Sequence, residues 1–168
     1  MNILEKFKTI KKKLLIIENI YFLIFILLIF FSDRFTKFKI INNFSENRYF
    51  INDFLNFELI WNPGVGFGLL SINNHFIYNA ITGFIGIIIV LLVYFFLNSK
   101  SIEKAIYSMI IGGALGNFYD RIIYKAVPDF IDLHYNNFHW FTFNFADIFI
   151  TIGVILYISN DLIIKKNE

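Results

Sequence analysis

The chain has 168 residues, a length that fits one domain. Hydrophobic residue types make up 57% of it and 23 residues are phenylalanine, which is too apolar for an ordinary soluble domain. The formal net charge of +2 is too small to indicate nucleic-acid binding. The sequence contains no cysteine, which excludes disulfide bonds and thiol chemistry.

Four apolar stretches are close to the roughly 20 residues that cross a hydrocarbon core. We predict membrane spans at residues 14–31, 76–97, 102–121 and 145–164. The alternative, a soluble protein with unusually apolar core helices, fits the composition poorly. The chain is therefore interpreted as one integral-membrane domain over residues 1–168, an all-α membrane protein with four transmembrane helices.

Charge predicts the orientation of these spans. Nine basic residues fall in the N-terminal tail, in the loop between the second and third spans and in the C-terminal tail, and six fall on the other side. Short loops rich in lysine and arginine stay in the cytoplasm. Both termini are therefore predicted to be cytoplasmic, and residues 32–75 and 120–144 to lie on the outer, periplasmic face.

The first outer segment carries the signs of a small β element. Residues 56–61 roughly alternate polar and apolar types, which indicates a short strand. Residues 62–68 contain a proline and three glycines, which indicate tight turns. The second outer segment, residues 120–144, is dense in aromatic types that settle at headgroup level. We expect it to be an interfacial segment along the membrane surface.

The third span ends in a run of small and polar residues. Gly112 and Gly116 are spaced as a small-xxx-small pair, which lets another helix pack closely. Asn117 and Arg121 are four residues apart and share a helix face. We interpret Asp120 as half of an ion pair with Arg121 that anchors the end of the helix.

Two aspartates are the candidates for acid–base chemistry. Asp147 occupies the third position of the fourth span if Asn144 is its N-cap, where the helix dipole favours an ionised carboxylate, and a purely capping role is the alternative. Asp129 has no basic residue nearer in sequence than Lys125, and an apolar setting raises a carboxyl pKa. If the two carboxyls meet, one holds a proton and the other is ionised. We assign the proton to Asp129 and the charge to Asp147.

The histidines do not predict a metal centre. His75, His134 and His139 are scattered and lack the spacing of a zinc site, so we predict no metal ligand. The glycines of residues 64–68 lack the Gly-Lys-Ser/Thr ending of a phosphate-binding loop.

Five blocks of sequence follow one another along nearly the whole chain. They are Asp33 with Lys37 (Asp-x-x-x-Lys), residues 62–67 (Asn-Pro-Gly-Val-Gly-Phe), residues 112–121 (Gly-Gly-Ala-Leu-Gly-Asn-Phe-Tyr-Asp-Arg), residues 127–132 (Val-Pro-Asp-Phe-Ile-Asp) and residues 143–147 (Phe-Asn-Phe-Ala-Asp). In this order they resemble the bacterial lipoprotein signal peptidase family, signal peptidase II, and the third block is a very close match to its most specific one.

The resemblance implies a fold and an activity. The family consists of four-helix aspartic peptidases of the bacterial inner membrane, with the active site near the outer face. They remove the signal peptide from prolipoproteins by cutting just before a diacylglyceryl-modified cysteine. The resemblance therefore implies prolipoprotein substrates, membrane lipids as neighbours, no nucleic acid, no cofactor and no metal. A monomer suffices, because a lipid-anchored substrate enters from the bilayer.

The resemblance also implies which residues form the site. The catalytic pair falls on Asp129 and Asp147. Substrate-binding positions fall on Asn62, Gly64, Asn117, Arg121, Asn144 and Ala146. Structural support falls on Asp33, Lys37 and Asp120.

Four departures from the family pattern leave every catalytic group in place. They are Arg34 for a usual Gln, Val65-Gly66 for Ala-Ala, Pro128 for Val and Ile148 for Ser or Thr. We expect them to affect rate and inhibitor affinity rather than reaction type.

Two other classes of protein are alternatives. A small membrane transporter or proton-relay component is the first alternative, because membrane carboxylates also serve proton relays. The sequence has neither the internal repeat nor the paired broken helices that would favour it. A structural assembly protein is the second alternative, and it leaves Asp129 and Asp147 unexplained.

Overall fold

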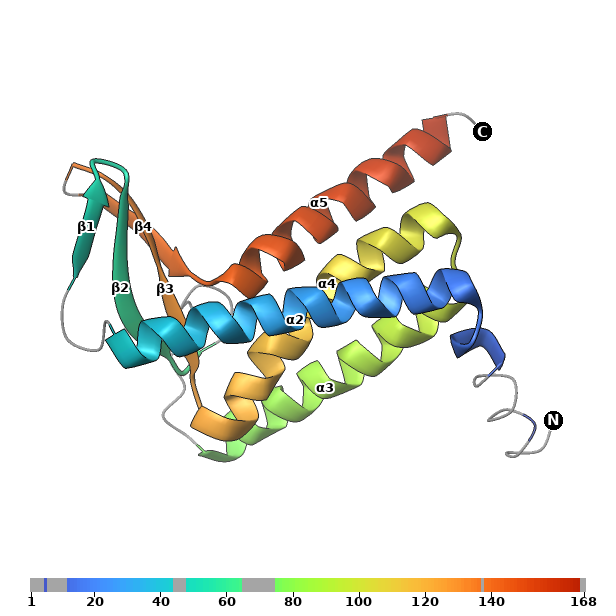
Figure 1. Cartoon of the computed structure of the whole chain (residues 1–168), viewed down its shortest axis with the longest axis horizontal. Helices are drawn as coiled ribbons and strands as arrows, with labels where there is room; N and C mark the ends of the chain where they lie inside the picture. The colour runs from blue at the N-terminus through green and yellow to red at the C-terminus, as the bar shows by residue number, and fades with distance from the viewer. Residues whose placement is uncertain (1–4, 6–11, 44–47, 65–74, 137, 167–168) are drawn as a thin grey trace.

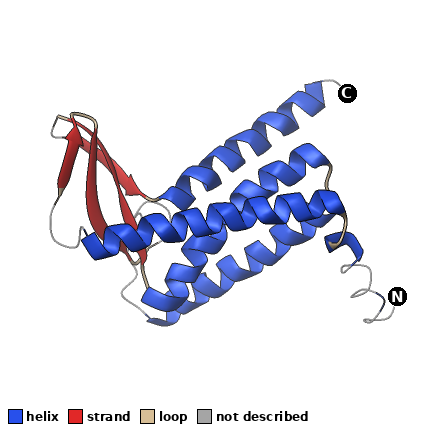
Figure 2. Ribbon diagram, in the orientation of Figure 1, coloured by secondary structure: helices blue, strands red, loops and turns tan. Residues whose placement is uncertain are grey.

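The computed structural model describes residues 5, 12–43, 48–64, 75–136 and 138–166. Within them, long helices form a bundle, and an antiparallel sheet covers one end of it (Figures 1 and 2). The helices are α2 (Ile17–Asn43), α3 (His75–Asn98), α4 (Ser101–Tyr124) and α5 (Phe145–Lys166). The start of α2 and the end of α5 both lie at the end of the bundle that is far from the sheet (Figure 1).

Three of these helices are long and apolar enough to cross a membrane, by length and composition. They are α2, α3 and the Phe145–Leu162 part of α5. Helix α4 does not reach the same apolarity. It packs against α2, α3 and α5, and its many buried positions include Lys104, Asn117 and Asp120. A helix enclosed by other helices tolerates polar side chains that find partners inside the protein.

Glycines on α4 let its neighbours approach the helix backbone. A Cβ atom at Gly112 would lie 2.8 Å from the Ile29 side chain of α2, and one at Gly116 would collide with the carboxylate of Asp33. The predicted packing role of Gly112 and Gly116 is confirmed, with α2 as the partner. Gly113 faces the other way, since a Cβ there would lie 2.5 Å from the carbonyl oxygen of Ala146 on α5.

Helix α2 continues to Asn43, well past the predicted end of the first apolar stretch at residue 31. The added turns contain Asp33 and Lys37, which are 0% and 1% exposed. These side chains form ion pairs inside the bundle. A helix can continue through charged residues when their charges are paired inside the bundle.

The sheet consists of β1 (Tyr49–Asn52), β2 (Leu55–Asn62), β3 (Val127–Tyr135) and β4 (Phe138–Phe143), in that spatial order. Strand β2 contains the strand predicted at residues 56–61. The second outer segment, predicted as an interfacial segment, forms β3 and β4 of the same sheet. Its aromatic residues suit a membrane interface, but aromatic residues also have a high preference for strands.

Pro128 lies near the start of β3, a central strand. It pairs with Trp61 of β2, whereas the pairing of β3 with β4 covers Ile131 to Tyr135. Proline has no N–H to donate, and the beginning of a strand is a place where sheets accept it. This departure from the family pattern is therefore compatible with the fold.

We expect Gly113→Ala to lower stability by about 1–3 kcal/mol, because the added methyl group meets the backbone of α5. Gly83→Ala on α3 is the matched control, since a Cβ there has nothing within 4 Å. It should leave stability unchanged or raise it, as alanine is the better helix former. Thermal unfolding of both variants in detergent measures the difference. Equal unfolding temperatures would contradict the close packing of α4 on α5.

Candidate active site

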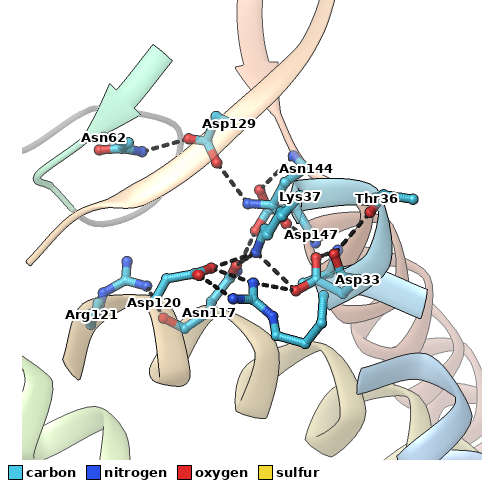
Figure 3. A network of polar contacts seen from close by, with 12 residues as sticks. Asp33, Thr36, Lys37, Asn62, Asn117, Asp120, Arg121, Asp129, Asn144 and Asp147 are labelled. Carbon is cyan, nitrogen blue, oxygen red and sulfur yellow. Dashed lines mark hydrogen bonds and ion pairs between the residues drawn. The ribbon is translucent and has the colours of Figure 1, made fainter. Parts of the chain in front are cut away.

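Asp129 and Asp147 line the same cavity, which has a volume of about 280 Å³. Asp129 lies on β3 and Asp147 lies in the first turn of α5, so the cavity forms where the sheet meets the bundle (Figure 3). The polar residues that share the lining are Asn62, Asn117, Arg121, Asn144 and Thr151. The apolar ones are Ile85, Ala114, Val127 and Ile150.

Asn144 connects the two aspartates. Its side-chain Nδ2 donates to Asp129 Oδ1 at 2.6 Å, and its Oδ1 accepts the backbone N–H of Asp147 at 3.1 Å. Its own backbone N–H donates to Asp147 Oδ2 at 3.1 Å. The predicted N-cap of the fourth span is confirmed, and Asp147 completes a reciprocal cap of the capping-box type. The same asparagine therefore begins α5 and orients both carboxyls.

Asp129 is 3% exposed and held at both of its oxygens. Asn62 donates to Oδ2 at 2.9 Å while Asn144 donates to Oδ1. Burial raises the pKa of Asp129 to about 6, and the nearby carboxyl of Asp147 adds to the rise against the two hydrogen bonds. The direction agrees with the one that we predicted from the apolar sequence around Asp129.

Asp147 is half-buried, in contrast to Asp129. Asn117 Nδ2 donates to its Oδ1 at 2.8 Å, and the N–H of Asn144 donates to its other oxygen. Donors on both oxygens and the positive end of the α5 dipole favour a negative charge at this position.

Lys37 is the centre of a buried network behind the cavity. Its Nζ lies 2.8 Å from Asn117 Oδ1, 2.7 Å from Asp120 Oδ2 and 3.0 Å from Asp33 Oδ2 (Figure 3). Because Asn117 accepts from Lys37 and donates to Asp147, the network fixes which way its amide faces. The position of Asp147 on α5 therefore depends on Lys37 of α2, through Asn117 of α4.

Arg34 belongs to the same network, which the sequence did not reveal. It forms ion pairs with both Asp33 and Asp120, the first at 2.9 Å, and its guanidinium lies 4.9 Å from the ring centre of Tyr119. Arg34 and Lys37 thus balance two buried carboxylates. Two cations within one turn of an apolar helix were the available signal, since charges there require partners.

The predicted ion pair between Asp120 and Arg121 is wrong. Asp120 pairs with Arg34 and Lys37 on α2, whereas Arg121 donates to the backbone carbonyls of Asn117 at 3.2 Å and Gly64 at 3.1 Å. Adjacent residues of a helix project in different directions, so the side chains of Asp120 and Arg121 face different neighbours. Asp120 lies against α2 and Arg121 reaches the cavity.

Gly64 and Ala146 contact the site through their backbones. The N–H of Gly64 donates to Asn62 Oδ1 at 2.8 Å, and the N–H of Ala146 donates to Asp33 Oδ1 at 3.0 Å. Neither lines the cavity, although both were predicted at substrate-binding positions. Among the departures, Val65-Gly66 lies outside the described residues. Ile148 lines an adjoining hollow of about 240 Å³, which shares Asp147 and Thr151 with the cavity.

The prediction that the histidines are scattered is wrong for two of the three. His134 and His139 stack with their ring centres 5.2 Å apart, and both lie next to Asp132. A turn of the chain between β3 and β4 brings them together, which residue spacing alone did not indicate.

Comparison with known proteins places the chain in a family. The family model described as signal peptidase (SPase) II matches residues 24–163, which is most of the chain and includes every residue of the site. The chain belongs to the signal peptidase II family. This membership gives no support to the transporter and assembly-protein alternatives.

Individual relatives agree. The lipoprotein signal peptidase of Pelagibacter ubique is 47% identical over 156 residues, covering 90% of this chain and 94% of the relative. That of Dichelobacter nodosus is 35% identical over 135 residues, covering 79% and 88%. A bacterial membrane enzyme solved by the in meso method at 2.3 Å resolution has a TM-score of 0.74 and 31% identity, covering 88% of this chain and 91% of its own.

We expect Lys37→Met to lower stability by about 3–5 kcal/mol, because it removes a buried cation from two buried carboxylates. Lys39→Met on the same helix is the control, since Lys39 is exposed and contacts the ring of Phe35. Unfolding temperatures in detergent compare the two. Similar small losses in both variants would show that the network does not support the fold.

Proposed function

We propose that Asp129 and Asp147 are the catalytic pair of an intramembrane aspartic endopeptidase. As a signal peptidase II, the chain removes signal peptides from prolipoproteins. We further propose that the substrates are diacylglyceryl-modified and that the cut falls on the N-terminal side of the lipidated cysteine. The observation that carries the residue assignment is the cavity in which Asn144 holds both carboxyls.

The two carboxyls divide the acid and base work. Asp147, half-buried at the helix N-terminus, is the ionised base that takes a proton from water as the water attacks the scissile carbonyl. Asp129, buried and with its pKa raised to about 6, holds the proton that hydrogen-bonds the carbonyl oxygen. Collapse of the tetrahedral intermediate breaks the C–N bond while a carboxyl proton passes to the leaving nitrogen. The pair titrates jointly, so the assignment is to one microstate.

The cavity supplies groups for an extended peptide. Asn62, Asn117, Arg121 and Asn144 offer donors and acceptors to the peptide backbone, and the apolar lining accepts small side chains near the cut. Gly64 joins Asn62 to Arg121 through its N–H and carbonyl, so it shapes the substrate side of the cavity. Ala146 also shapes the cavity through its backbone, because it precedes Asp147 in the first turn of α5 and its N–H donates to Asp33.

Asp33, Lys37 and Asp120 are assigned a supporting role. None of the three lines the cavity. Lys37 donates to Asn117, and Asp33 accepts from the backbone N–H of Ala146. Both of these groups adjoin Asp147. The network therefore acts on the reaction by positioning Asp147.

We also propose that α4 is a fourth span, that both termini are cytoplasmic and that the site lies near the outer face. Helix α4 has a length similar to that of α3 and packs on all three apolar helices. The sheet covers one end of the bundle, and the end of α3 and the start of α4 lie at the other end (Figure 1). Lys100 and Lys104 lie at the start of α4, and Lys13 bonds Asn98 at the end of α3, so these basic residues mark the predicted cytoplasmic end. Every group of the site comes from one chain, so a monomer is sufficient, and lipid surrounds it.

Replacement of either catalytic carboxyl tests the pair. With a diacylglyceryl-modified prolipoprotein in detergent, Asp129→Asn and Asp147→Asn should each lower the cleavage rate by about 10²–10⁴-fold or more. Asp120→Asn should unfold at a lower temperature yet keep measurable turnover, since Asp120 does not line the cavity. If folded Asp129→Asn or Asp147→Asn cleaves at the parental rate, the pair is not catalytic.

The pH dependence of the reaction tests which carboxyl holds the proton. Because Asp129 must be protonated, kcat/KM should fall as pH rises through about 6. Asn62→Ala removes a hydrogen bond that favours the ionised form of Asp129, so the fall should move to higher pH. An activity that increases across this range, or a profile that Asn62→Ala leaves in place, would contradict the assignment.

Single cysteines test the orientation, because the native chain has none. The two variants are Asp53→Cys and Ser99→Cys. Asp53 lies in the exposed turn between β1 and β2, and Ser99 lies between α3 and α4. In intact cells with a permeable outer membrane, an impermeant maleimide should label Asp53→Cys. Ser99→Cys should react only after the inner membrane is opened. The reverse pattern would invert the topology.

A further inference from the structure

A second group of ionisable side chains lies on the sheet, apart from the catalytic pair. Asp132 and His134 are alternate residues of β3, and His139 is paired opposite His134 on β4. Side chains alternate between the faces of a strand, so Asp132 and His134 lie on the face opposite to that of Asp129. The group is therefore not part of the active-site cavity.

The three side chains are close enough to share an ion. His139 Nδ1 lies 2.8 Å from Asp132 Oδ2, and His134 Nδ1 lies 3.9 Å from the same oxygen. One nitrogen or oxygen atom from each of the three residues falls within 4.8 Å of the others. A tetrahedral zinc ion with bonds of about 2.0–2.1 Å places its ligand atoms roughly 3.3 Å apart. The observed distances lie on both sides of that value, so small side-chain rotations suffice.

A side-chain amide faces two of the three residues. Asn56 Nδ2 lies 3.2 Å from Asp132 Oδ2 and 3.2 Å from His134 Nδ1. Because an amide NH₂ group only donates, His134 Nδ1 carries a lone pair, and an ion bound there would take the place of this hydrogen bond.

Asn56 keeps its Nδ2 toward Asp132 and His134 although its Oδ1 is buried and has no hydrogen-bond partner in the described part of the chain. A hydrogen-bond donor that supports the ligand carboxylate is a common arrangement behind a metal site.

We propose that Asp132, His134 and His139 bind a divalent transition-metal ion, with Zn²⁺ as the best match, and that the ion is structural. Two imidazoles and a carboxylate suit Zn²⁺, whereas Ca²⁺ and Mg²⁺ take oxygen ligands. His139 is partly exposed and offers a route for the ion to enter. The ion connects β3 to β4, the hairpin that leads from Asp129 to Asn144, and takes no part in peptide cleavage.

The test uses the full chain without a polyhistidine tag, treated with EDTA and then titrated with ZnCl₂. We expect about one Zn²⁺ per chain, a higher unfolding temperature with Zn²⁺, and no effect of Mg²⁺. Loss of a residue that only hydrogen-bonds a metal ligand weakens metal binding by about 10–100-fold. His139→Gln removes a ligand itself, so it should weaken Zn²⁺ binding by more than that. His75→Gln, which changes the exposed first residue of α3, should bind Zn²⁺ as the parent does.

Several outcomes would overturn the proposal. They are no stoichiometric binding by the parent, equal binding by His139→Gln, or loss of binding in Asp129→Asn, which would place the ion at the catalytic pair. If His139→Gln does not fold, Co²⁺ bound to the parent decides. Strong visible absorption from tetrahedral coordination supports the site, and the weak absorption of hexahydrated Co²⁺ overturns it.

Discussion

The burial of Lys37 is the interaction on which the rest of the structure depends. An ammonium group that is 1% exposed is unstable unless carboxylates surround it, and Asp33 and Asp120 supply them. These pairs require α2 and α4 to lie close together, which only a residue without a side chain at position 116 permits. The same lysine orients Asn117, and Asn117 orients Asp147. The packing of the bundle and the geometry of the site thus have one electrostatic cause.

The site joins elements of different kinds. Asp147 comes from an apolar helix, and Asp129 comes from a sheet at the end of the bundle. Side-chain amides of Asn62 and Asn144 hold both oxygens of the buried Asp129. Asp147 instead accepts from the backbone N–H of Asn144 and from the side chain of Asn117. The two carboxyls therefore have different donors although they share Asn144, and the acid–base division that we propose for them rests on this difference.

Local features of the site could be predicted from the sequence, and long-range pairings could not. The cap formed by Asn144 and Asp147 spans three residues, so the pattern of residues sufficed, and the glycine spacing on α4 likewise predicted close packing. The partners of Asp120 lie 83 and 86 residues away, and the adjacent Arg121 was mistaken for one of them. His134 and His139 meet because of the strand register and an irregularity in it, which no spacing rule contains.

The double use of Asn144 has a dynamic consequence. Its backbone and side chain hold the first turn of α5 together and also hold Asp129. The ends of helices open and close more readily than their centres. Each opening of this turn would break the hydrogen bonds through which Asn144 connects Asp129 to Asp147. A molecule that bound both carboxyls would therefore keep the turn closed and slow hydrogen exchange at the amides of Asn144 and Asp147.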